Sequence, residues 1–308
     1  MTILQAIVLG IVQGLTEFIP ISSTAHLIFA TRATGLSRTL DAEQITATIA
    51  VIQLGTLLAV FVYFAGDIWS IASAFVRDHL ALVGVGQRAR GVEGSGGSGG
   101  SGGGFFARLS DEARLGWLII IGSIPIGTIG LLLKKQIEGP ATKNLWLIAA
   151  MMIVVAVLLI IAERVGRRRK EMRDLGLKDA LAVGFAQVLA LVPGASRSGS
   201  TIMGGLFAGE TRETAARFSF LLSIPAIAAS GLLELFKEVG KLPAGSAAPL
   251  ILATVVSGVV GYASIWFLLR FLRTHSTNIF IVYRLIVGAL ILALLVAGVL
   301  AAHDAATV

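Results

Sequence analysis

Two polar clusters of opposite charge interrupt stretches of sequence that are otherwise apolar. The first lies within residues 10–26 and contains Glu17 and His26. The second lies within residues 184–201 and contains Arg197. A buried charge without a partner costs several kcal/mol, so an ionisable residue at membrane depth indicates a functional site. We therefore expect the two clusters to meet and to form one site.

The second cluster, Pro193-Gly-Ala-Ser-Arg-Ser-Gly-Ser-Thr201, is dense in hydrogen-bond donors. A glycine such as Gly194 lets backbone amides approach an anion closely, and a following helix N-terminus adds the positive end of its dipole. The guanidinium of Arg197 can bind two phosphate oxygens at once. The cluster therefore predicts an anion site, although a packing loop that satisfies a broken helix is the alternative. The hydroxyl residues expected to line this site are Ser196, Ser198 and Thr201.

The first cluster supplies complementary chemistry. Glu17 could bind a divalent cation or act as a base, and His26 could shuttle protons near neutral pH. The alternative for Glu17 is a plain ion pair with Arg197. The hydroxyl residues between them, which could act as nucleophile or orient a phosphate, are Ser22, Ser23 and Thr24.

The composition indicates a polytopic helical membrane protein. The chain is 56% hydrophobic and only 14% charged, and its mean hydropathy is +0.87. Cysteine is absent, which excludes disulfides, thiolate metal sites and a cysteine nucleophile. The net charge of +7 is better explained by Lys and Arg in cytoplasmic loops than by nucleic-acid binding, which we do not expect. The first residues lack the basic start of a removable signal and are interpreted as the first membrane segment.

Eight apolar segments are long enough to cross a bilayer. They lie at about 3–31, 44–66, 115–134, 144–163, 179–208, 214–235, 249–271 and 280–301. The first and fifth are interrupted near their middles by Pro, Gly, Ser and Thr. Because proline removes a backbone donor and clashes with the preceding turn, both segments should break there. Non-helical backbone at membrane depth survives only when it is buried in protein or lines a polar cavity.

The distribution of Lys and Arg favours six membrane-spanning helices and two re-entrant hairpins, 3–31 and 179–208, over eight spanning segments. The hairpin topology gives the larger charge asymmetry, and the positive-inside rule then places both termini outside. The charge-poor outer face holds Arg32, Arg38, Lys134, Lys135, Lys143, Lys237 and Lys241. The charge-rich inner face holds loops 67–114 and 164–178, together with Arg212, Arg217, Arg270, Arg273 and Arg284.

This topology predicts an inverted repeat, because three crossings between the hairpins make them enter from opposite faces. The repeats are 1–163 and 164–308, and each begins with a Gly-x-x-Gln…Pro pattern that contains Gln13 or Gln187. The two glutamines could hydrogen-bond across the interface between repeats, where such folds place their site. Chance similarity between two apolar stretches is the alternative. The Gly/Ser-rich segment 94–104 predicts a flexible loop without chemistry.

The two clusters together resemble the undecaprenyl-diphosphate phosphatase family of the BacA/UppP type. The resemblance rests on Gln-Gly-Leu-Thr-Glu-Phe-Ile-Pro-Ile-Ser-Ser-Thr-Ala-His and Pro-Gly-Ala-Ser-Arg-Ser-Gly-Ser-Thr in this order. It continues at Ile52-Gln-Leu-Gly55, at Phe218–Pro225 and at Tyr283-Arg284, and covers the chain except for the Gly/Ser loop. The family's first motif is Glu/Gln-x-x-x-Glu, and this chain has Gln at Gln13. Glu17 is therefore the only carboxylate of the motif, which argues against a two-carboxylate metal site.

The resemblance implies an enzyme of the bacterial inner membrane that removes the terminal phosphate of undecaprenyl diphosphate and so recycles the lipid carrier of cell-wall synthesis. It also implies help from a divalent cation, Mg²⁺ or Ca²⁺, and a site that opens to the outer face. Arg197 and the amides around Ser196 and Ser198 would hold the diphosphate, and Ser23 would be the nucleophile with His26 as its base. Direct attack by water, activated by His26 or Glu17, is the other route. Apolar walls would hold the prenyl chain.

Two other functions agree with parts of the sequence. A secondary transporter or lipid flippase would also use inverted repeats with broken helices. An acid-phosphatase-like lipid phosphatase would share the fragments Ser23-Thr-Ala-His26 and Ser196-Arg197. That family also needs a His-x-x-x-Asp element, and none of His79, His275 and His303 has an aspartate four positions later. A homodimer is compatible with the sequence, which contains nothing that sets the oligomeric state.

Overall fold

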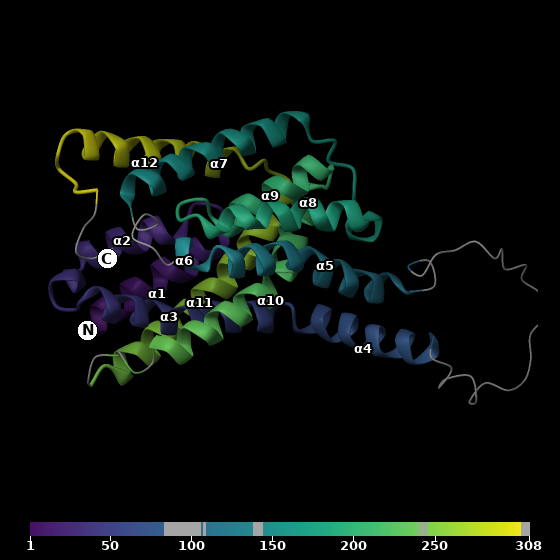
Figure 1. Ribbon diagram of the computed structural model, residues 1–308, viewed down its shortest axis with the longest axis horizontal. Helices are drawn as coiled ribbons and strands as arrows, with labels where there is room; N and C mark the ends of the chain where they lie inside the picture. Colours follow the sequence, from purple (N-terminus) through teal and green to yellow (C-terminus); the bar gives the residue numbers. More distant parts are fainter. Residues whose placement is uncertain are drawn as a thin grey trace, which may run out of the picture.

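The fold is a bundle of helices, shown as a computed structural model in Figure 1. The structure describes residues 1–82, 106, 109–137, 144–238, 240, 242 and 245–302. The helices are α1 (Ile3–Phe18), α2 (Ser23–Ala33), α3 (Ala42–Tyr63), α4 (Ala65–Leu82), α5 (Asp111–Leu132), α6 (Lys134–Ile137), α7 (Leu145–Val165), α8 (Leu177–Val188), α9 (Arg197–Ala208), α10 (Arg212–Glu238), α11 (Ala247–Leu272) and α12 (Asn278–Val296).

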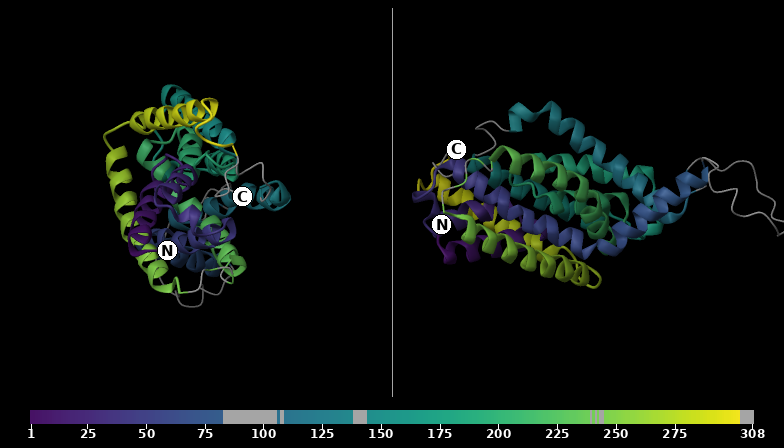
Figure 2. Two further views of the ribbon diagram at one scale, coloured as in Figure 1. Left: turned by 90° about the vertical axis from the view of Figure 1, so that its left-hand side faces the viewer. Right: turned by 90° about the horizontal axis from the view of Figure 1, so that it is seen from below.

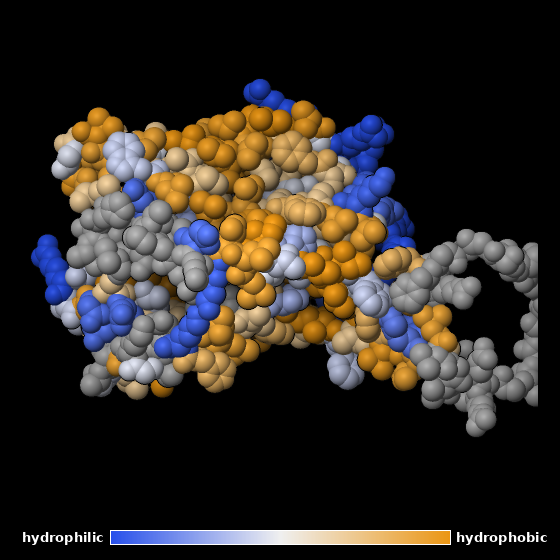
Figure 3. Space-filling model, in the orientation of Figure 1, coloured by the Kyte–Doolittle hydropathy of each residue, from blue (hydrophilic) through white to orange (hydrophobic). Residues whose placement is uncertain are grey.

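Six helices in the described part of the chain are long and apolar enough to cross a membrane: α3, α5, α7, α10, α11 and α12. The face drawn in Figure 3 is apolar across its middle, while hydrophilic side chains gather toward its two ends. This distribution fits a bilayer that surrounds the middle of the bundle. The expectation of a helical multi-pass membrane protein with six spanning helices is confirmed.

The two broken segments each form a pair of short helices whose outer ends meet. In the first segment, the Gln5 side-chain amide near the start of α1 donates to the Thr34 carbonyl just after α2, at 2.9 Å. In the second, the backbone amides of Arg169 and Lys170, which precede α8, donate to the Gly209 carbonyl after α9. In each segment, therefore, the residues that precede the first short helix or begin it are hydrogen-bonded to residues that follow the second.

The bases of the two pairs lie at opposite ends of the molecule. The N- and C-termini share one end in Figure 1, where α1 begins, and α4 projects from the other end. Helix α7 begins at the end with the termini, where the Leu145 amide donates to the Ala302 carbonyl. It therefore delivers the chain to the opposite end before α8 begins. The right-hand view in Figure 2 shows the same arrangement from below.

Glycines allow the short helices to pack closely against long helices of the other half of the chain. Helix α1 lies on α11, and α8 lies on α5. A Cβ atom at Gly14 would lie 2.8 Å from the Ser257 carbonyl oxygen of α11, and one at Gly184 would lie 2.3 Å from the Gly122 carbonyl oxygen of α5. Small residues of this kind let helix backbones approach closely in a membrane, so α1 packs directly against α11 and α8 against α5.

Helix α4 is an element that the sequence analysis did not predict. We expected residues 67–114 to form a loop, but α3 is followed almost at once by α4, which runs to Leu82 and is mostly exposed. An ion pair of 2.6 Å between Asp67 and Arg217 connects the start of α4 to α10. The predicted Gly/Ser-rich loop, 94–104, lies outside the described residues.

Candidate active site

Both helix breaks have the same local geometry, with a serine in a left-handed backbone conformation directly before the second helix. Ser22 precedes α2 with a φ of 79°, and Ser196 precedes α9 with a φ of 68°. This conformation is rare for residues other than glycine and is found mainly where surrounding structure enforces it. Gly194 also has a positive φ, and a Cβ atom there would lie 2.3 Å from the Ile148 carbonyl oxygen. Only glycine fits this close approach to α7.

The two charged clusters meet, as the sequence predicted. Arg197, the first residue of α9, donates from its Nη2 atom to the Glu17 Oε1 atom near the end of α1. The side chain of Glu17 is 7% exposed and that of Arg197 is 19% exposed. Gln13, one turn before Glu17, donates from its Nε2 atom to the Glu17 Oε2 atom at 3.2 Å. Glu17 thus has partners from both helix pairs, while the other guanidinium donors of Arg197 have no partner among the residues that the structure describes.

The ion pair lies beside a cavity of about 740 Å³. Eight of the residues predicted for the site line this cavity: Gln13, Glu17, Ser22, Ser23, Thr24, Gly194, Ser196 and Arg197. The hydroxyls of Ser22, Ser23 and Thr24 have no hydrogen-bond partner within the described part of the chain, so they can turn toward a ligand. The cavity therefore brings together an arginine from the second break with a carboxylate and unengaged hydroxyls from the first.

The rest of the cavity wall is largely apolar and comes from α2, α3, α5, α10 and the second break. Its apolar residues include Leu27, Ile49, Ile126, Leu131, Leu191, Val192, Ala226 and Leu233. Three polar residues that we did not predict as part of the site, Gln53, Ser123 and Lys134, also line it. A ligand with a charged group at one end and a hydrocarbon chain at the other matches these walls.

Three predicted site residues, His26, Ser198 and Thr201, are not among the described residues that line the cavity. Ser198 lies 3.2 Å from the Ser196 hydroxyl, and this hydroxyl also accepts the Gly199 amide. Thr201 is fully buried, donates to the Arg197 carbonyl at 2.8 Å and contacts the hydroxyl of Ser219. These two residues therefore support the first turn of α9, which holds Arg197.

His26 lies one turn after Ser23 on α2, but its imidazole faces α12. The Nδ1 atom lies 2.6 Å from the Ser22 carbonyl oxygen, and the Nε2 atom lies 2.6 Å from the Tyr283 hydroxyl. Because a carbonyl oxygen only accepts, Nδ1 carries the proton and Nε2 accepts from Tyr283. The structure therefore places His26 beside the lining serines without bringing it into contact with Ser23.

Arg284 is buried in the bundle, whereas the sequence analysis predicted that it lies on a charged face. We counted it with the charged inner face, but it lies within α12 with no exposed surface. Its guanidinium donates to the carbonyls of Pro20 in the first break and of Gly194 and Ala195 in the second. It also donates to carbonyls of α7, at Met151 and Met152. An arginine in an apolar helix was the signal that could have identified it.

The residues of the cavity can supply only a small set of ligands to a divalent cation. Within the described residues there is no group of three or more His, Asp or Glu side chains that could hold a metal. Glu17 is available, and the buried Oε1 atom of Gln13 has no hydrogen-bond partner. Mg²⁺ is commonly bound through one or two carboxylates together with substrate phosphates. The site therefore fits a cation that is shared with a phosphate ligand, not an all-protein metal site.

Comparison with known proteins identifies the family. Residues 6–290 match the family of bacitracin resistance protein BacA. The chain belongs to this family. Three similar proteins are each named undecaprenyl-diphosphatase. The protein of Syntrophobacter fumaroxidans is 50% identical over 292 residues, covering 95% of this chain and 97% of the relative. The protein of Chlorobium phaeovibrioides is 46% identical, and the alignment covers 97% of this chain and 99% of the relative. The protein of Nocardia farcinica is 44% identical, and the alignment covers 98% of each chain. The resemblance drawn from the two motifs is confirmed.

Proposed function

We propose that the protein is an integral membrane phosphatase that hydrolyses undecaprenyl diphosphate to undecaprenyl phosphate and phosphate. The observation that carries this function is the contact between Glu17 and Arg197 at the edge of a cavity with apolar walls. The charged edge suits a diphosphate, and the walls suit a prenyl chain. The family and its similarly named relatives agree with this activity.

In the proposed mechanism Arg197 binds the terminal phosphate and neutralises the charge that develops during transfer. The amides of Arg197 and Ser198 at the start of α9 would add donors to the same anion, because the first amides of a helix have no partner within it. Glu17 and the Gln13 Oε1 atom would hold the divalent cation when it is bound together with substrate. The cation would add positive charge beside the phosphate oxygens.

Ser23 is the proposed nucleophile. Its Oγ atom would form a bond to the terminal phosphorus while the bond to the bridging oxygen breaks, and undecaprenyl phosphate would leave. Water would then release phosphate from the serine. His26 would accept the serine proton, which requires its Nε2 atom to exchange Tyr283 for Ser23. Direct attack by water, activated by His26 or Glu17, is the second route.

The topology proposed for this enzyme is an inverted repeat with re-entrant hairpins in the bacterial inner membrane. Equivalent features recur at one constant interval along the chain: the helix starts Ile3 and Leu177, Gln13 and Gln187, and the serines Ser22 and Ser196. The cavity includes Lys134 from the charge-poor end, which the positive-inside rule places outside the cell. The site would therefore open to the outer face.

The decisive experiment measures phosphate release from undecaprenyl diphosphate by the purified protein in detergent. We expect turnover that falls when EDTA removes divalent cations. A pure transporter or flippase would release no phosphate, because it breaks no covalent bond. Absence of phosphate release with Mg²⁺ and Ca²⁺ present would therefore contradict the proposed function.

A further inference from the structure

A second cavity lies between the end of α7 and the start of α12, at the charge-rich end of the bundle. Its volume is about 390 Å³, and none of its residues belongs to the active-site cavity. The polar residues that line it are Glu163, Arg164, Arg168, Arg212, Ser276 and Asn278. Its apolar residues are Ile160, Ile281, Val282 and Leu285. We call this cavity the α7–α12 groove.

The groove has a positive charge that its one carboxylate does not cancel. Arg168 and Arg212 both contact the Glu163 Oε2 atom, at 3.0 and 2.7 Å. The Thr277 amide and hydroxyl donate to the other oxygen, so the hydrogen-bonding capacity of this carboxylate is largely used. Within the described residues Arg164 has no hydrogen-bond or ion-pair partner. The groove therefore has more arginines than carboxylates.

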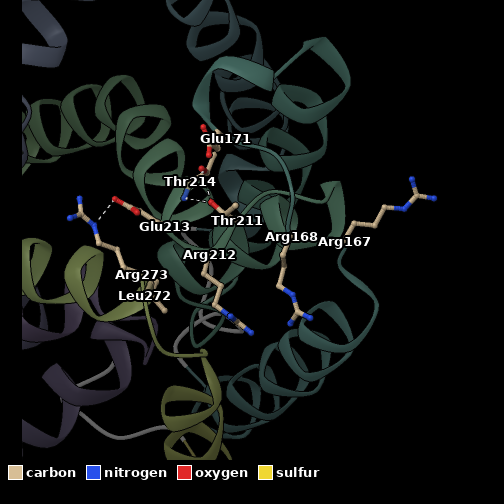
Figure 4. A pocket seen from close by; sticks show the side chains of 9 residues that line it. All are labelled: Arg167, Arg168, Glu171, Thr211, Arg212, Glu213, Thr214, Leu272 and Arg273. Atoms are coloured by element: carbon tan, nitrogen blue, oxygen red, sulfur yellow. Dashed lines mark hydrogen bonds and ion pairs between the residues drawn. The ribbon is translucent and has the colours of Figure 1, made fainter.

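Two of the arginines, Arg168 and Arg212, are held at the border between this groove and a neighbouring pocket. Arg168 adopts a left-handed backbone conformation with a φ of 49°, and its Nη1 atom donates to the Glu163 Oε2 atom at 3.0 Å. A strained residue of this kind indicates a position that the surrounding structure enforces. Figure 4 shows the adjoining pocket, in which Arg168 and Arg212 extend in the same direction while Arg273 pairs with Glu213. The two arginines thus line both cavities.

Polar and apolar residues of the groove are separated along each helix. On α12, Val282 and Leu285 follow Asn278 by one and two turns on the same face. On α7, Ile160 lies one turn before Arg164, toward the middle of the bundle. Both helices therefore place charge or hydrogen-bond donors at the end of the bundle and apolar surface nearer its middle. A free inorganic anion would use only the first of these regions.

We propose that the α7–α12 groove binds an anionic phospholipid, with its phosphodiester at Arg164, Arg168 and Asn278 and the start of an acyl chain against Val282 and Leu285. Charge complementarity selects an anionic headgroup, and the apolar inner half selects a lipid over a soluble phosphate. Basic pockets between helices at the membrane surface are suited to such headgroups. The site is separate from the proposed catalytic site and does not depend on its chemistry.

The test measures binding of phosphatidylglycerol to the purified full chain by native mass spectrometry in detergent. Arg164→Gln removes a charge without breaking an ion pair, and we expect about fivefold weaker binding, the effect of one basic residue at a lipid headgroup. Arg169→Gln is the matched control, because Arg169 is exposed at the same end and does not line the groove. Equal binding by both variants, or equal loss in both, would overturn the site.

A second pair of variants tests the acyl half of the groove. Val282→Asn should weaken binding of phosphatidylglycerol, whereas Ile279→Asn, at an exposed residue of α12 that does not line the groove, should not. Glycerol phosphate, which has the headgroup phosphate but no acyl chain, should fail to displace the lipid at equal concentration. Displacement by glycerol phosphate, with Val282→Asn unaffected, would show a site for soluble phosphate and would contradict the lipid proposal.

Discussion

At the scale of single residues, the Glu17–Arg197 pair explains why two opposite charges can be kept in an apolar protein. Each charge compensates the other, and removing one partner of a buried pair typically costs about 3–5 kcal/mol because the remaining charge is left uncompensated. The pair has a second consequence for the proposed reaction. A phosphate that enters the cavity must compete with Glu17 for the guanidinium, and a shared cation would reduce the repulsion between phosphate and carboxylate.

Arg197→Lys should reduce kcat/KM by at least about 100-fold. Lysine keeps the positive charge but loses the planar pair of donors that binds two phosphate oxygens. Steady-state phosphate release measures this effect, and Arg270→Lys serves as a control because Arg270 lies far along α11, over the ring of Trp266. Turnover near normal in Arg197→Lys would show that Arg197 is only the counter-ion of Glu17.

Ser23→Ala should abolish turnover and leave KM little changed, because a nucleophile acts in the chemical step. Both Ser22 and Ser23 line the cavity, so Ser22→Ala is the matched control and should lose much less activity. If Ser23→Ala retains substantial kcat while His26→Ala is inactive, water attack replaces the serine route. Rapid-quench detection of a phosphorylated serine provides the direct measurement.

Glu210 makes stability depend on pH. It is buried between α9 and α10, and its carboxylate oxygens have no hydrogen-bond partner in the described residues. Burial, and to a smaller extent repulsion from Asp179, raises the pKa of Glu210 to about 8, although the attraction of Lys170 opposes this rise. The pKa of Glu210 is higher in the folded state than in the unfolded state. The protonated carboxyl group therefore contributes its full stabilisation of the fold below the unfolded pKa, and this contribution is lost as pH rises through about 8. The unfolding temperature should therefore fall across this range. Glu210→Gln should flatten the dependence, and an unchanged slope would contradict the assignment.

At the scale of elements, the two breaks are held together by Arg284. Its guanidinium binds carbonyls from both breaks and from α7, so the cavity walls on either side are fixed to α12. Tyr283, the preceding residue, holds His26. Neighbouring residues of one helix therefore position the loop backbones and the imidazole.

Arg284→Lys should lower both stability and kcat, because one ammonium cannot reach the carbonyls that the guanidinium fork spans. Each buried carbonyl left without a donor costs about 1–3 kcal/mol, so the thermal unfolding midpoint should fall clearly. Arg273→Lys is the control, since Arg273 is exposed and pairs with Glu213. Normal stability together with normal turnover in Arg284→Lys would contradict the positioning role.

The sequence predicted the breaks and the meeting of the charges because both have strong local signals. Pro20 and Pro193 interrupt apolar segments, and an unpaired charge at this depth is too costly to leave alone. The partners of His26 and Arg284 could not be predicted, because they come from residues far along the chain and depend on how the helices pack. Helix α4 was missed because its apolar content is too low for a membrane segment.

At the scale of the whole molecule, the two helix pairs start at opposite ends, and a labelling experiment can establish which end is outside. A cysteine at Arg38 should react in intact cells with an impermeant thiol reagent, while a cysteine at Arg169 should react only after lysis. Both positions are exposed, and the native chain has no cysteine to interfere. Labelling of Arg169→Cys in intact cells would reverse the proposed orientation.

The cavity that holds the ion pair also reaches the outer surface of the bundle. Leu131 of α5 and Leu233 of α10 line it and are largely exposed at the same time. A prenyl substrate could therefore slide in sideways from the bilayer and never dissolve in water. The quantity that governs saturation is then the mole fraction of substrate in the membrane, and inert lipid would act as a diluent. Of the two products, only phosphate would leave for the aqueous phase, while the carrier lipid would stay in the leaflet that delivered it.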